Sequence, residues 1–370
     1  MGLKKTVGSD QDPTVWFQKI MKIVTLLLFL SLQLFARAQE KIVTGEQHCL
    51  YSSVLKEERR IRVALPRNYS NSKITPASYP VLYVLDGEMA FEYYTAIVNF
   101  LSKGVYASMP EMIVVGIDNT DRTRDMTPTR ASKRAPDDST KILFQNSGGA
   151  ENFSTFIGQE LTRFIDSAYR TSGFKLLAGH SFGGLFSTYH LLRGQPAFHA
   201  YLIHAPSLWW DHQVMLSQAR QTLPKANFGR ARVYVSQANN KEKGVFDAHF
   251  ESIKMFKNIC DSINNPSLAI RYEFYENEDH GTLPLPAAYN GLKFIFDGYQ
   301  VDFKKIANNY ASLSESYSAF SKKTNFHFQP SEYMLHFIVE YFKDNGKPAA
   351  AAAVLKQYQQ LYPKTAPPTL

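Results

Sequence analysis

One serine of this chain has the surroundings that a nucleophile requires. Residues 175–178 form a short apolar run that leads into Gly179-His180-Ser181-Phe182-Gly183. This is a G-x-S-x-G pattern between an expected strand and a helix expected from about Gly184. The glycines fit a tight turn, where side chains at Gly179 and Gly183 would collide with neighbouring backbone. The first N–H groups of the helix would stabilise an oxygen that gains negative charge, so the pattern predicts Ser181 as the nucleophile.

A base for this nucleophile is expected after a later strand. Residues 269–276 alternate apolar and polar side chains, as a half-buried strand does, and His280 follows shortly after them. The chain order, with the serine before the histidine, is that of a large group of serine enzymes. His280 is therefore the candidate general base, and a solvated loop histidine is the alternative. No pair of histidines has the spacing of metal ligands, so we expect neither a metal nor a cofactor.

An acidic side chain usually orients the histidine of such a pair. It should follow the strand expected over residues 231–236. Glu242 is closest to the end of that strand and is the first candidate, while Asp247 is the alternative. Glu242 lies between two lysines and could belong to an ordinary charged loop, and Asp247 could be a helix-start residue. A serine and histidine that work without an acid are a third option.

Two N–H donors are needed to stabilise the oxyanion. One is expected from the backbone of Phe182, the residue after the nucleophile. The other is expected after the strand over residues 79–85, from the backbone of Gly87 or Glu88. A glycine there would let the backbone approach a substrate closely. A plain Asp-Gly turn is the alternative.

Three further side chains are candidate substrate contacts. Arg122, like the neighbouring Arg124, could bind an anionic or polar substrate, although pairing of an arginine with Asp118 or Asp125 to hold the loop is the favoured interpretation. Trp209 and Trp210 could line an acyl or aromatic pocket, or could pack the start of a helix on the sheet.

Several separated segments together resemble the putative-esterase family of α/β-hydrolases. This family includes siderophore esterases, S-formylglutathione hydrolases, feruloyl esterases and mycolyl-transferring antigens. The resemblance extends from about residue 50 to 298 and is carried by residues 51–69, 80–87, 115–119, 122–128, 179–184, 205–211 and 279–281. The Ser-Leu-Trp-Trp segment at 207–210 is most similar to the siderophore-esterase branch. The resemblance implies an ester or thioester substrate and an acyl-enzyme on Ser181 that water resolves.

The loop expected to carry the acid departs from the family pattern. Residues 239–242 read Asn-Asn-Lys-Glu and lack the Gly-x-x-Glu or Gly-x-x-Asp of some members. The choice between Glu242 and Asp247 therefore stays open.

The first 38 residues have the pattern of a secretory signal peptide. The largely apolar run over residues 23–35 is shorter than the roughly 20 residues of a membrane span. Lys19 and Lys22 precede it, and residues 36–38 supply an Ala-x-Ala cleavage site. We expect cleavage after Ala38, with Met21 as an alternative start, and a periplasmic or secreted protein. An uncleaved anchor is the alternative, and no later segment is expected to span a bilayer.

Charge and cysteine content limit the other functions. The formal net charge of the chain is +8, and residues 1–38 carry five Lys or Arg and two Asp, which leaves +5 for the remainder. The basic residues form no run with interleaved aromatic side chains, so we expect no nucleic-acid binding. Cys49 and Cys260 could pair in an oxidising compartment, but they lie far apart in the sequence, which does not place them together, and neither resembles a catalytic thiol.

The order of the elements predicts a mostly parallel, doubly wound sheet over residues 39–300, and the resemblance implies that it has the α/β-hydrolase fold. Strands are expected near 60–66, 79–85, 112–118, 174–179, 199–205, 231–237 and 269–275. Helices are expected over 153–169, 185–193, 246–263 and 287–299. Strand signals stop after residue 301, and helices expected over 310–322, 331–344 and 348–361 form a small all-α extension over 301–370. This extension resembles a tetratricopeptide hairpin, which would pack on the body or bind a protein partner.

Three functions fit these observations. The favoured one is a serine esterase that acts on a small ester such as a siderophore, a feruloylated or acetylated sugar, or a short acyl ester. The second is an acyltransferase on the same residues, with an alcohol in place of water. The third is a non-catalytic binding or scaffold protein, against which the presence of Ser181, His280 and Gly87 argues.

Overall fold

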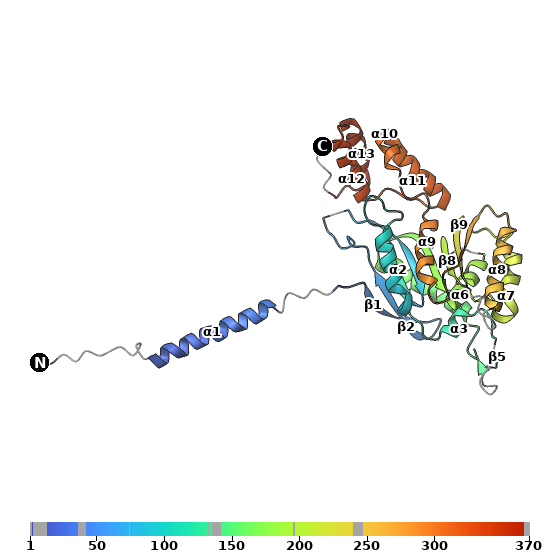
Figure 1. The fold of residues 1–370 in the computed structure, drawn as a ribbon, viewed down its shortest axis with the longest axis horizontal. Coiled ribbons are helices and arrows are strands. Elements are labelled where there is room, and N and C mark those ends of the chain that lie inside the picture. Colours follow the sequence, from blue (N-terminus) through green and yellow to red (C-terminus); the bar gives the residue numbers. More distant parts are fainter. Residues whose placement is uncertain are drawn as a thin grey trace. The chain divides into compact units, whose positions relative to one another are not determined.

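The computed structural model describes residues 2, 13–35, 42–73, 75–131, 133–134, 142–194, 197–239 and 247–365. The chain divides into two compact units, residues 1–44 and residues 45–370. Helix α1 (Pro13–Phe35) belongs to the first unit (Figure 1). Among the described residues, no helix is both long and apolar enough to cross a membrane. The predicted cleavage site at residues 36–38 lies outside the described residues.

An eight-stranded sheet forms the centre of the second unit. Its strand order is β1-β2-β4-β3-β7-β8-β9-β10. The six strands from β4 to β10 in this order are parallel, whereas β1 and β2 are antiparallel to their neighbours. The predicted, mostly parallel sheet is therefore confirmed. The strands are β1 (Glu46–Ser52), β2 (Glu57–Ala64), β3 (Tyr79–Leu85), β4 (Ile113–Ile117), β7 (Thr171–His180), β8 (Ala200–His204), β9 (Ala231–Ala238) and β10 (Leu268–Tyr275).

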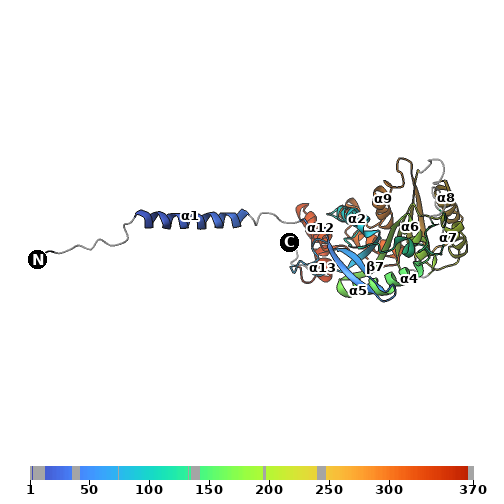
Figure 2. The ribbon, with the colours of Figure 1, turned by 90° about the horizontal axis from the view of Figure 1, so that it is seen from below.

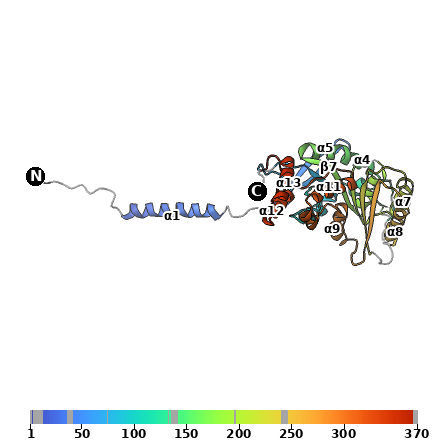
Figure 3. The ribbon, with the colours of Figure 1, turned by 90° about the horizontal axis from the view of Figure 1, so that it is seen from above.

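Helices cover both faces of this sheet, which is why its central strands are buried and largely apolar. Figure 2 shows α2 and α9 against one face and α4 and α5 against the other, and Figure 3 shows α9 again on the side opposite α4 and α5. All residues of β3, β4, β8 and β9 are buried, whereas the edge strand β10 is partly exposed. The helices of this body are α2 (Gly87–Leu101), α3 (Arg122–Met126), α4 (Ala150–Thr155), α5 (Thr162–Ala168), α6 (Phe182–Leu192), α7 (Trp210–Thr222), α8 (Asp247–Asp261) and α9 (Pro284–Ile295).

The helix predicted over residues 153–169 is interrupted. A π-helical turn, η2 (Phe156–Leu161), separates α4 from α5. Phe156, Ile157 and Leu161 of this turn are buried, so the wider turn brings extra apolar side chains to the core. The sequence expectations also did not include β1 or α2, and they gave α7 only as a possible helix start at Trp209 or Trp210.

The predicted helical extension is present and belongs to the same compact unit as the sheet. It contains α10 (Phe303–Asn308), α11 (Ala311–Thr324), α12 (Glu332–Asp344) and α13 (Pro348–Leu361) (Figure 1). Phe174 of β7 contacts Phe326 and Phe328, each with 5.1 Å between ring centroids. Lys323 of α11 forms an ion pair with Asp297 at 2.6 Å. The extension therefore packs on the body, while a domain boundary at residues 300/301 remains a prediction.

Candidate active site

The predicted nucleophile lies on a strained turn between a strand and a helix. Strand β7 ends at His180, and α6 begins at Phe182, two residues earlier than expected. Ser181 between them has φ 59° and ψ −114°, a conformation that costs an L-residue free energy. Such strain persists only where the surrounding structure imposes it, so the turn holds Ser181 in one defined orientation.

Two glycines allow the neighbouring segments to approach this turn. A Cβ atom at Gly179 would lie 2.2 Å from the carbonyl oxygen of Gly183, so a side chain there is excluded. A Cβ atom at Gly183 would be 3.3 Å or more from its neighbours, and its nearest contact is a side-chain oxygen. The expected backbone collision at Gly183 is therefore wrong. A collision with backbone would instead occur at Gly184, where a Cβ atom would lie 2.9 Å from the carbonyl oxygen of His204.

The predicted base lies beside the turn. His280 follows β10 and precedes α9, and its ring centroid is 4.4 Å from that of His180. The ring of His249, on α8, contacts His280 from another direction at 5.0 Å and 88°. Burial lowers the pKa of His280, the charge of Arg122 lowers it further, and Asp279 partly opposes both effects. His280 is therefore held neutral, the form in which an imidazole accepts a proton.

The imidazoles of His180, His249 and His204 are also held neutral. Burial, followed by the neighbouring His280, lowers the pKa of His180 to about 2 and that of His249 to about 4. Burial lowers the pKa of His204 to about 3. Across the described parts of the chain, no three His, Cys, Asp or Glu side chains are grouped so that they could hold a metal ion.

The described residues contain no acid that orients His280. Its Nδ1 atom is buried and has no hydrogen-bond partner among them. Asp247 is the exposed first residue of α8, so the structure does not bring the alternative candidate to Nδ1. Glu242 lies in the segment 240–246, outside the described residues. The carboxylate of Asp279 accepts hydrogen bonds from the N–H groups of Gly281 and Thr282 and so stabilises its own loop.

The predicted oxyanion donors lie at the starts of two helices. Phe182 is the first residue of α6, and Gly87 and Glu88 are the first two of α2. The first N–H groups of a helix have no partner within it, so they are available to an oxyanion. The reason for the glycine differs from our expectation. A Cβ atom at Gly87 would lie 2.6 Å from the backbone nitrogen of Ile117, so β4 excludes a side chain there.

Arg122 joins the start of α2 to the turn that carries Ser181. Its guanidinium donates to both carboxylate oxygens of Asp86, at 2.6 and 3.0 Å, and to the carbonyl oxygen of His180 at 3.2 Å. The expected pairing of an arginine in this loop with Asp125 is found for Arg124, at 2.7 Å, whereas Arg122 pairs with Asp86 instead. An arginine that holds these two segments fixes the spacing of the two sets of N–H donors.

Aromatic side chains surround Phe182. Trp210 is buried, contacts Phe182 at 5.5 Å, and donates from Nε1 to the hydroxyl of Thr129 at 3.1 Å. Trp209 is half-buried and lies 6.1 Å from Phe182. Phe144, which follows the short hairpin of β5 (Lys133–Arg134) and β6 (Ile142–Leu143), contacts all three rings. Trp210 thus packs the fold, and Trp209, which is less buried, remains a predicted substrate contact.

The sequence reasoning missed Ser207. Its hydroxyl oxygen lies 3.3 Å from Oγ of Ser181, and its backbone N–H donates to the carbonyl oxygen of Ser181 at 3.1 Å. The signal was the Pro-Ser-Leu-Trp segment at residues 206–209, which we used only for the family resemblance.

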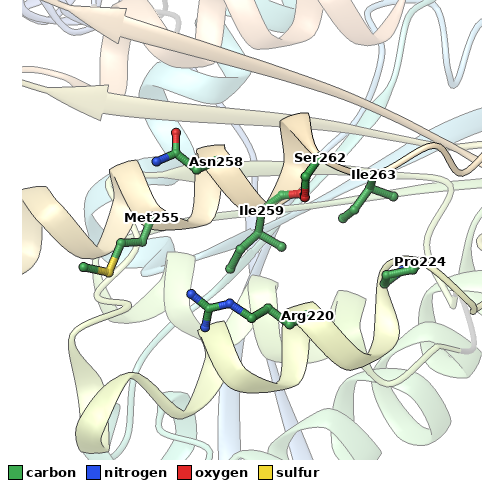
Figure 4. A pocket seen from close by; sticks show the side chains of 7 residues that line it. All are labelled: Arg220, Pro224, Met255, Asn258, Ile259, Ser262 and Ile263. Atoms are coloured by element: carbon green, nitrogen blue, oxygen red, sulfur yellow. The ribbon is translucent and has the colours of Figure 1, made fainter.

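A separate pocket of about 370 Å³ lies between α7 and α8 (Figure 4). Its lining contains none of the predicted catalytic residues, so it is not the candidate active site. The lining residues are Arg220, Pro224, Met255, Asn258, Ile259, Ser262 and Ile263.

Comparison with known proteins agrees with this geometry. A family model described as Putative esterase matches residues 52–280, which is more than half of the chain. The chain belongs to the putative esterase family. It is accordingly a hydrolase that acts on ester bonds, and its sheet and helices form the α/β-hydrolase fold.

Individual relatives place the chain in the siderophore-esterase-like branch of this family. The siderophore enterobactin esterase of Emericella nidulans is 29% identical over 216 residues, which are 50% of this chain and 71% of that protein. The ferri-bacillibactin esterase BesA of Bacillus subtilis is 31% identical over 152 residues, which are 39% of this chain and 53% of that protein. The chain therefore matches only about half the length of the Bacillus relative.

A solved structure extends the similarity beyond the matched family segment. An IroE-like serine hydrolase from Shewanella oneidensis superimposes with a TM-score of 0.76 at 30% identity. The match covers 86% of this chain and 99% of that one, so most of the second unit has a counterpart there.

Proposed function

We propose that this esterase works through an acyl-enzyme on Ser181, with His280 as the general base. The observation that carries the proposal is the strained Ser181 turn beside a histidine that burial and Arg122 keep neutral. His280 takes the proton of the Ser181 hydroxyl as its oxygen attacks the ester carbonyl, and then delivers it to the departing alcohol. Water, activated by the same imidazole, then resolves the acyl-enzyme.

The negative charge that forms on the carbonyl oxygen is assigned to backbone donors. These are the N–H of Phe182 and an N–H of Gly87 or Glu88, each at the positive end of a helix. The proposed acid is Glu242, whose segment lies between β9 and α8. The buried, unpartnered Nδ1 atom of His280 supports the need for such an acceptor.

For the substrate, we propose a small ester of the siderophore type. Two relatives are named as esterases of enterobactin and of ferri-bacillibactin. The rings of Phe144, Phe182 and Trp209 next to the nucleophile could pack against an aromatic or acyl group. Arg122 is engaged with Asp86, so we do not assign it to the substrate. Feruloylated or acetylated sugars and short acyl esters are the competing substrates.

We further propose that residues 1–38 are a signal peptide and that the mature enzyme is periplasmic or secreted. The division of the chain into units 1–44 and 45–370 supports this, because removal of the leader would not divide the catalytic unit. The sizes of the fragments released on export, measured by mass spectrometry, would show whether cleavage occurs after Ala38.

The decisive experiment is hydrolysis of a chain-length series of p-nitrophenyl esters and of a tricatecholate siderophore. We expect Ser181→Ala to lose at least about a thousand-fold in kcat, because a nucleophile has no substitute. A fluorophosphonate probe should label the wild type at Ser181 and leave the variant unlabelled. A wild type that is inactive on every ester and unlabelled would contradict the proposal, and products joined to an added alcohol would identify an acyltransferase.

A further inference from the structure

We propose that Ser207 is a positioning residue for Ser181. Its hydroxyl holds the nucleophilic oxygen in the orientation from which the Ser181 proton passes to His280. The proposal rests on the proposed function, since it assigns Ser207 a part in the attack by Ser181. The observation behind it is the 3.3 Å contact between the two hydroxyl oxygens.

The backbone, rather than a flexible side chain, places Ser207 against the nucleophile. The N–H of Ser181 donates to the carbonyl oxygen of His204 at 3.0 Å, and the N–H of Ser207 donates to that of Ser181 at 3.1 Å. Ala205, which lies between His204 and Ser207 in the chain, has φ 37°, a left-handed conformation that is unfavourable for alanine. The absence of a side chain at Gly184 allows this close approach, because a Cβ atom there would lie 2.9 Å from Cα of Pro206. A strained residue and an obligatory glycine thus both serve this approach.

The hydroxyl of Ser207 has a single hydrogen-bond partner within the described parts of the chain. Ser207 is 2% exposed, and that partner is Oγ of Ser181. Burying a hydroxyl is unfavourable unless it is hydrogen-bonded, and an alanine would fill nearly the same space without that requirement. Packing alone therefore does not account for a serine here, whereas a contact with the nucleophile does.

The direction of this hydrogen bond follows from the chemistry of attack. Ser181 must donate its proton towards His280, so its oxygen can only accept from Ser207. Ser207 keeps its own proton throughout, and the Ser181 proton moves to the imidazole of His280 as the bond to the carbonyl carbon forms. The contact is longer than the usual hydroxyl distance of about 2.8 Å. Catalytic hydrogen bonds are commonly long before substrate binds and shorten on the way to the transition state.

The test measures the rate at which a fluorophosphonate labels the full chain, together with kcat and KM for p-nitrophenyl acetate. We expect Ser207→Ala to lower the labelling rate and kcat about ten-fold, the effect of one orienting hydrogen bond. KM and the melting temperature should be unchanged. Ser207→Thr keeps the hydroxyl and should recover the rate to within about three-fold of the wild type.

Ser52→Ala is the matched control. Ser52 is also fully buried and donates its hydroxyl to Glu160, but it lies on β1 at the far edge of the sheet, so the labelling rate should not change. Labelling of Ser207→Ala at the wild-type rate would overturn the inference. The inference would also be overturned if Ser207→Ala and Ser207→Thr lost the same labelling rate and both melted at a lower temperature. That result would mean that Ser207 contributes only to packing. If the wild type itself is not labelled, the proposed function fails and this inference fails with it.

Discussion

His280 is enclosed by other imidazoles, and this arrangement bears on its proton affinity. The rings of His180 and His249 contact it within 5.0 Å, and neither can relieve a positive charge on it. Burial is the largest cause of its lowered pKa, and the guanidinium of Arg122 is the next. Because the neutral form is the base, a lowered pKa extends activity towards lower pH.

The pH dependence of hydrolysis tests this. We expect kcat/KM to rise as His280 loses its proton, with a midpoint below the ordinary histidine value of 6.5. Arg122→Gln removes a positive charge and should move the midpoint to higher pH. Arg124→Gln is the control, because Arg124 pairs with Glu57 and Asp125 instead. A midpoint that stays in place or falls in the Arg122 variant would show that this charge does not act on His280.

At the residue scale, the sequence predicted the groups that belong to a recognisable motif. Ser181 and His280 were predicted from a strand, a turn and their order, and the structure places their segments side by side. The partner of Arg122 was not predictable, because Asp86 lies 36 residues away in the chain. Ser207 was missed for a similar reason, since its contact with Ser181 depends on how two adjacent strands end.

Among the elements, α2 depends on a close approach to the sheet. Its first residue, Gly87, lies directly against β4, and the preceding Asp86 is in the left-handed conformation with φ 55°. The proposed second oxyanion donor belongs to this first turn. Its position is therefore set by packing on β4 as well as by the end of β3.

Gly87→Ala should disturb both stability and activity. The new methyl group would lie 2.6 to 2.7 Å from the backbone of Ile117 and Gly116, so α2 must move. We expect a loss of about 1 to 3 kcal/mol in the free energy of unfolding, measured by denaturant titration. Displacement of an oxyanion donor should lower kcat about a hundred-fold.

Gly158→Ala is the control for this variant. A Cβ atom at Gly158 would have no neighbour within 4 Å, so neither property should change. An active, fully stable Gly87→Ala enzyme would mean that α2 can shift without consequence.

The sequence predicted the buried parallel strands of the sheet because these have continuous apolar runs. Strand β3 has the expected bounds, and β4, β8, β9 and β10 differ from expectation by no more than one residue at either end. Strands β2 and β7 each begin three residues earlier than expected. The π-helical turn η2 was not predictable, since a single wide turn leaves the helical spacing of apolar residues almost intact. The bounds of helix α7 were not predictable from helical periodicity, because Asp211, His212 and Gln213 adopt left-handed backbone angles within it.

In the molecule as a whole, the C-terminal helices complete the core of the catalytic unit. Phe174 and Phe296 are at most 1% exposed, and residues of the extension contact both rings. Tyr299 is buried as well and lies 5.5 Å from Tyr317 of α11. The inner face of α11 is therefore occupied by the body of the fold, which favours a packing role for this helix over a docking site for another protein.

Deletion of residues 309–370 tests this role. We expect the shortened chain to melt at a lower temperature or to aggregate, because the apolar surface around Phe174 becomes exposed to water. Thermal melts followed by circular dichroism would show this. Deletion of residues 1–44, a separate unit, is the control and should leave the melt unchanged. If the C-terminal deletion leaves melting and activity intact but abolishes capture of a partner, the extension is a docking module.

The order of the strands also governs when the enzyme becomes active during its synthesis. From β3 through β7, β8 and β9 to β10, each strand lies beside the one before it, and the loops after them supply the proposed functional groups in that same order. A ribosome-bound chain that has emerged only as far as the loop after β8 carries Ser181 and Ser207 but not the proposed base. The last of these groups in the chain is His280, and the helices that complete the core follow it. A growing chain therefore has the proposed nucleophile before it has the proposed base.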